Sequence, residues 1–163
     1  MRAERIWILG AWLLIVVVVA HAVYGFERTL KDGQLILLEL APVDPRSLMQ
    51  GDYMALRFAV DGQLPTLEQN MATYAHLHLG ARGRAVLAGS GVQPSSEPGV
   101  VSVRIRRGKW GASVGPNAFF FQEGTAAVYE RARWGGFRVA DDGTALLVGL
   151  YDAEFQLLGS NQR

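Results

Sequence analysis

Four charged side chains and a tyrosine gather around a proline-rich turn, and together they could form hydrogen-bonded ion pairs. Asp44 and Arg46 lie within the turn, and Asp52, Tyr53 and Arg57 follow it. A carboxylate and a guanidinium can share charge-assisted hydrogen bonds, and an aspartate in a turn also accepts bonds from backbone amides. Two interpretations stay open. The cluster holds its own turn together, or it is a recognition site in which Asp52 and Arg46 fix the turn and Tyr53 presents its ring to a partner or small ligand.

A second pair of side chains has the spacing of metal ligands. His76 and His78 share the outward face of one predicted strand, so two imidazoles could reach one ion. A zinc site needs at least a third protein ligand, and the chain has no cysteine and only scattered carboxylates. We therefore predict two solvated histidines, no metal site and no cofactor.

The run Leu48-Met49-Gln50-Gly51-Asp52 resembles the L-x-x-G-D that follows the nucleophile in membrane-bound signal peptidases and related Ser-Lys proteases. Such an enzyme needs a serine ahead of the turn and a lysine within hydrogen-bond reach of it. Here Asp44 stands ahead of the turn and Ser47 is shifted into it. The two lysines, Lys31 and Lys109, belong to a polar stem and a glycine-rich loop. We predict no catalytic residues, and a divergent membrane-bound hydrolase stays the alternative.

The residues after the turn alternate, as in a half-buried strand. Met54, Leu56, Phe58 and Val60 fall on one face. Tyr53 has the opposite parity, so its ring should face away from the core. The sequence therefore predicts a strand from residue 54 to residue 60 that begins directly after the proline-rich turn.

The turn and this strand resemble the signature of the bacterial GDYXXLXY protein family, closely over residues 42–58 and loosely from about residue 35 to the C-terminus. Phe58 stands where the family name has tyrosine, so this chain lacks the tyrosine hydroxyl at that position. The resemblance implies an N-terminal membrane segment and a multi-span membrane protein, encoded nearby, as partner. The family carries no assigned biochemistry. The matching residues are Pro42, Val43, Asp44, Pro45, Arg46, Leu48, Gly51, Asp52, Tyr53, Leu56 and Phe58, with Glu123, Gly124 and Glu130 as further favoured positions.

An uncharged run from Ile6 to Phe26 precedes all of this. As a helix it would span roughly 30 Å of hydrocarbon. Arg2 and Arg5 lie before the run and the charges after it nearly cancel, which predicts a cytoplasmic N-terminus and an exported domain. The alternative is a cleaved signal peptide, because Ala20-His21-Ala22 has the form of a cleavage site.

The remaining chain consists of short apolar or alternating runs separated by glycine- and proline-containing turns, with one short helical segment. This pattern is typical of a mainly β domain, an antiparallel barrel or sandwich. The predicted strands cover residues 35–40, 54–60, 73–79, 84–88, 101–105, 119–121, 137–139, 144–151 and 155–158, and the predicted helix, capped by Thr125, covers 126–133.

Length, net charge and the lack of cysteine limit the number of domains and the kinds of partner. The 163 residues leave room for one domain behind the apolar segment. A net charge of +1 gives no reason to expect a nucleic-acid partner, and the lack of cysteine excludes disulfide-linked partners.

The sequence thus predicts a single-pass protein of the bacterial inner membrane whose domain lies in the periplasm. Residues 1–5 are the cytoplasmic end, 6–26 the transmembrane signal anchor that contacts the lipid bilayer, 27–34 the stem and 35–163 the β-rich domain. We predict a non-enzymatic accessory or interaction module for a membrane protein. A hydrolase and a small-ligand sensor are the alternatives.

Overall fold

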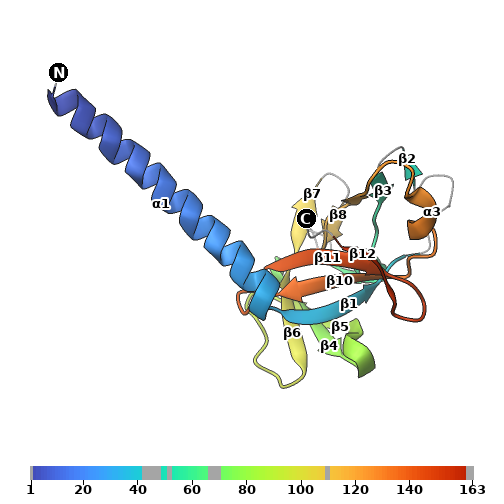
Figure 1. Cartoon of the computed structure of the whole chain (residues 1–163). Helices are drawn as coiled ribbons and strands as arrows, with labels where there is room; N and C mark the ends of the chain where they lie inside the picture. Colours follow the sequence, from blue (N-terminus) through green and yellow to red (C-terminus); the bar gives the residue numbers. More distant parts are fainter. Residues whose placement is uncertain (1, 42–48, 51–52, 66–70, 109–110, 161–163) are drawn as a thin grey trace.

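The computed structural model describes residues 2–41, 49–50, 53–65, 71–108 and 111–160. Within these residues one long helix leads into small antiparallel sheets, with one short α-helix near the C-terminal third (Figure 1). The predicted fold class is confirmed. The elements are α1 (Arg2–Asp32), β1 (Gln34–Glu39), β2 (Met49–Gln50), β3 (Tyr53–Ala55), the 3₁₀ helix η1 (Ala59–Gln63), β4 (Tyr74–Leu79), the 3₁₀ helix η2 (Ala81–Gly83), β5 (Ala85–Gly91), β6 (Val100–Arg104), β7 (Arg106–Gly108), β8 (Gly111–Ser113), β9 (Ala118–Phe120), α3 (Ala126–Tyr129), β10 (Trp134–Val139), β11 (Ala145–Tyr151) and β12 (Leu157–Ser160).

Helix α1 contains no proline, and it continues without a break past the apolar run into the segment predicted as a stem. Its stretch Trp7–Asp32 is long and apolar enough to cross a membrane, and its most apolar part is exposed on all sides. The helix ends at Gly33, whose amide donates to the Thr29 carbonyl at 3.0 Å. A side chain at Gly33 would collide with that same carbonyl oxygen, so glycine is required where the helix meets the sheet.

The helix continues into a four-stranded sheet of order β1-β10-β11-β12. Ile36, Leu37 and Leu38 of β1 are buried, so both faces of this strand are covered, whereas Leu35 is 40% exposed. β10 and β11, which overlap the predicted strands 137–139 and 144–151, form a hairpin. Gly143, with φ of +84°, lies in its turn.

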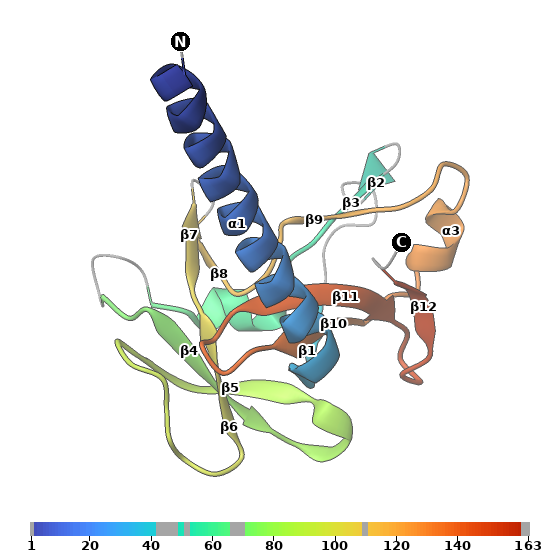
Figure 2. The same ribbon diagram turned by 60° about the vertical axis from the view of Figure 1, so that its left-hand side comes forward.

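A second sheet has the order β5-β4-β6, and β7 pairs with β8 (Figure 2). Ala75 and Leu77 of β4 are fully buried, as the alternation predicts. The β7–β8 hairpin corrects the sequence prediction, which places no strand between residues 105 and 119. Its strands are rich in glycine and arginine and carry no alternation, so pattern reading missed them.

The predicted strand 54–60 is shorter than expected. β3 ends at Ala55, after which the Leu56 amide donates to the Asn117 carbonyl and the chain turns into η1. The predicted faces are nevertheless right, because Leu56, Phe58 and Val60 are all buried. Phe58 also forms an isolated antiparallel bridge with Leu40, so alternate side chains keep pointing inward beyond the end of β3.

The predicted helix 126–133 is also too long, since α3 ends at Tyr129. Thr125 does not cap it; its hydroxyl donates instead to the Gln122 carbonyl at 2.6 Å. The Arg133 amide donates to the Tyr151 carbonyl, because the backbone here pairs with β11 just before β10 begins.

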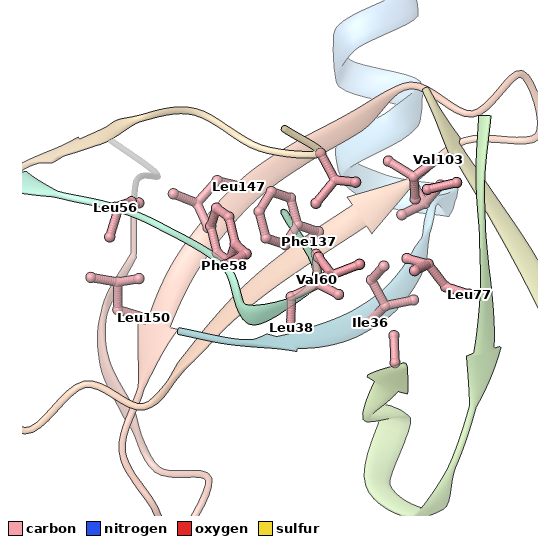
Figure 3. Packing of buried hydrophobic residues seen from close by; sticks show 14 of the residues in the cluster. Ile36, Leu38, Leu56, Phe58, Val60, Leu77, Val103, Phe137, Leu147 and Leu150 are labelled. Atoms are coloured by element: carbon pink, nitrogen blue, oxygen red, sulfur yellow. The ribbon is translucent and has the colours of Figure 1, made fainter. Parts of the chain in front are cut away.

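The domain core lies between the sheets and is centred on two phenylalanines (Figure 3). Phe58, 1% exposed, meets the fully buried Phe137 edge to face with ring centroids 5.1 Å apart. Gly115 and Gly135 leave the space for these rings: a Cβ at either position would lie within 2.8 Å of a Phe58 ring carbon. The last signature position therefore supplies the central side chain of the core.

Candidate functional site

The site predicted at the signature turn is described only in part. Asp44, Arg46 and Asp52 lie outside the described residues, so their predicted roles stay predictions. Tyr53 is half-buried in β3, and Arg57 is exposed after it. Where the structure does describe the signature, it separates two faces: a buried one that builds the core and an outer one that carries these two polar side chains.

The outer face of β3 carries an aromatic pair. Tyr53 lies directly opposite Phe120 of β9 in the antiparallel register, and their ring centroids are 5.8 Å apart. The inward neighbours Met54 and Phe119 are buried, 3% and 2% exposed, while Phe120 is 71% exposed. We call Tyr53 and Phe120 the aromatic edge.

The parity argument for Tyr53 is thereby confirmed, but sequence reading did not select Phe120. It is the middle residue of the triplet Phe119-Phe120-Phe121, and a uniform triplet does not reveal which ring faces outward. Phe119 and Phe121 instead pack against Tyr129 of α3, with centroids 5.2 and 5.1 Å away. The signal that would find Phe120 is its register against Tyr53, which requires the strand pairing.

Asp61, in η1, is a half-buried charged group shortly after the signature. Its carboxylate accepts from the amides of Phe58 (3.1 Å) and Val114 (3.0 Å) and from the hydroxyl of Ser113 (3.2 Å). Burial raises the pKa of Asp61, while these donors and the charge of Arg57 oppose the rise. Asp61 thus joins the end of the signature to the loop after β8, an internal cross-link that the sequence did not indicate.

His76, His78 and Lys31 lie apart from this region, on β4 and α1. His76 is half-buried, with Nδ1 3.1 Å from the Ser102 hydroxyl, and His78 is exposed on the same strand. Among the described residues no group of three or more histidines and carboxylates could hold a metal ion. Lys31 lies on α1, 3.7 Å from Glu27, whereas Ser47 and Lys109 lie outside the described residues.

The fold and the site together define a class of protein: a β-rich domain carried on one long apolar helix, with an aromatic pair on the outer face of a signature strand whose inner face builds the core. The sequence matches the GDYXXLXY protein family over residues 15–150, and the chain belongs to that family. No curated protein matches the chain. No solved structure matches it either.

Proposed function

We propose that this chain is a membrane-anchored interaction module that binds an integral membrane protein. In this proposal α1 spans the bacterial inner membrane with its N-terminus in the cytoplasm, and the domain binds its partner in the periplasm. The apolar length of α1 and the placement of Arg2 and Arg5 before its uncharged run support the topology. In this proposal the chain is not cleaved after Ala22, and α1 runs without a break from Arg2 to Asp32.

The observation that carries the proposal is the aromatic edge. Tyrosine and phenylalanine offer large contact areas with few rotatable bonds, and aromatic side chains are enriched at protein interfaces. β9, which carries Phe120, has only β3 as a hydrogen-bonded neighbour among the described strands. An exposed aromatic ring on a strand edge is therefore available to a partner.

The position of the edge indicates the kind of partner. In both views α1 projects upward, with β2 and β3 in the upper part of the domain and β4, β5 and β6 below (Figures 1 and 2). A domain tethered by α1 would carry the aromatic edge nearer the membrane than the β4–β6 sheet. A protein embedded in the same membrane fits this placement. The charged side chains predicted for the signature turn, Asp44, Arg46, Asp52 and Arg57, would add charge-assisted contacts to the same partner.

Cross-linking from position 120 tests the proposal. A photoreactive phenylalanine replaces Phe120 in the full chain in native membranes, and a matched chain carries it at Val86, which is 62% exposed in the distant β5. We expect position 120 to cross-link to an integral membrane protein and position 86 not to do so. Equal cross-linking from both positions, or none from 120, would overturn the proposal.

Phe120→Ala should weaken retention of that same partner in mild detergent by at least about tenfold, the loss typical of truncating an aromatic hot spot. Val86→Ala is the control, because it also shortens an exposed apolar side chain. Retention that is equal in the two variants would contradict a role for the aromatic edge.

A further inference from the structure

A groove of about 550 Å³ lies between the last turns of α1 and the β10–β11 turn. Arg138 of β10 donates to the Gly33 carbonyl at 2.8 Å, which joins the end of the helix to the sheet, and within the helix the Thr29 hydroxyl donates to the Gly25 carbonyl at 3.0 Å. The groove is therefore part of the junction between helix and domain.

One end of the groove is apolar and belongs to the candidate membrane span. Ala22, Gly25 and Phe26 line it, and the uncharged run of the sequence ends at Phe26. A Cβ built at Gly25 would meet nothing within 4 Å, so the helix surface here borders open space. An acyl chain from the adjoining bilayer can lie against this end without any change in the protein.

The other end of the groove is charged. Arg28, Asp32 and Asp141 line it, all three are exposed, and none forms a hydrogen bond or ion pair through its side chain with another described residue. Asp142 also lines the groove, but it is engaged by Arg104 at 3.2 Å and by the amide and hydroxyl of Thr144, both at 2.9 Å. One cation and two carboxylates are thus left to meet a ligand.

We propose that this groove binds a phospholipid with a primary-amine headgroup, its acyl chain along Ala22 and Gly25, its phosphate at Arg28 and its ammonium at Asp32 and Asp141. The inference rests on the proposed anchoring of α1, which brings the groove to the level of the headgroups. The groove carries an excess of negative charge, so a purely anionic headgroup is disfavoured. A trimethylammonium headgroup lacks the N–H donors that carboxylates bind.

Native mass spectrometry of the full chain in mild detergent tests this, with equal amounts of palmitoyl-oleoyl phosphatidylethanolamine, phosphatidylcholine and phosphatidylglycerol. We expect the ethanolamine lipid to be retained about tenfold over the other two, a ratio within reach of one charge-assisted hydrogen bond. Asp32→Asn combined with Asp141→Asn should abolish this preference. Retention of the three lipids in equal amounts would overturn the inference.

Two glycine variants separate the groove from the rest of the helix. Gly25→Trp places a ring in the open space of the groove and should abolish preferential retention. Gly10→Trp, also free of neighbours within 4 Å, lies far from the groove on the same helix and should leave retention unchanged. Equal effects of the two variants would contradict the groove as the site. Likewise, Arg28→Gln should lower retention of all three lipids, whereas Lys31→Gln, outside the groove lining, should not.

Two separate measurements test the proposed anchoring: the mass of the mature chain, and its flotation with vesicles of the same three lipids. A chain that starts at Val23 or fails to float contradicts the anchor itself. A chain that floats intact but shows no headgroup preference contradicts only the lipid site.

Discussion

Phe58→Ala should cost about 3–5 kcal/mol of unfolding free energy, the loss typical of deleting a large aromatic side chain from a packed core. Phe58 is 1% exposed and packs against Phe137, with Gly115 and Gly135 flanking its ring. Gly115 and Gly135 have no side chains with which to fill part of the cavity left by the ring. The loss should therefore fall at the upper end of the range.

Denaturant unfolding of the full chain in detergent, followed by near-ultraviolet circular dichroism, measures this change. Phe120→Ala is the matched control, since it makes the same substitution at a ring that is 71% exposed, and its effect should stay within about 0.5 kcal/mol. Equal losses for the two variants would mean that Phe58 does not fill the core as described.

This contrast also shows how far sequence reading reaches. The buried face of the signature was predictable because inward-pointing side chains recur at every second position, and Leu56 and Phe58 obey that rule beyond the end of β3. The strand boundary was not predictable, since it depends on the distant partner Asn117, to which the Leu56 amide turns. The alternation of residue types therefore predicts which side chains face the core more reliably than it predicts which backbone segments pair.

The candidate site was recovered less completely. Tyr53 followed from parity, but its neighbour Phe120 depends on the pairing of β3 with β9, which lie more than sixty positions apart. The groove beside α1 combines residues of the helix with the β10–β11 turn, and no local pattern joins Arg28 to Asp141. Sites formed between distant segments leave no spacing signature in one sequence.

The contacts of Asp61 were likewise only partly predictable from the sequence. In the sequence, Asp61-Gly62 is an ordinary turn that ends a strand, and its bond to the Phe58 amide is the local contact that such a turn predicts. Its bonds to Ser113 and Val114 cross more than fifty positions. The residue is therefore a cross-link between two loops, and its removal should affect the whole domain.

Asp61→Ala should destabilise the chain by about 2–4 kcal/mol, because it leaves the amides of Phe58 and Val114 without their acceptor in a largely buried place. Asp61→Asn keeps one side-chain oxygen as acceptor and should lose roughly half as much. The same unfolding measurement in detergent applies. An Asp61→Ala chain as stable as the original would show that the two loops do not depend on this carboxylate.

The pH dependence of the stability lost in Asp61→Asn tests whether desolvation or the hydrogen bonds and nearby charge dominate the pKa of Asp61. Burial is the largest influence and raises its pKa, so the folded chain holds a proton at pH values where the unfolded chain has lost it. The stability that this proton contributes is fully present below the ordinary aspartate pKa of about 3.9 and is lost as pH rises through the raised pKa of the folded state. The cost of Asp61→Asn should therefore be larger near pH 3 than near pH 8. A cost that grows toward pH 8 would mean that the amides of Phe58 and Val114 and the charge of Arg57 outweigh desolvation.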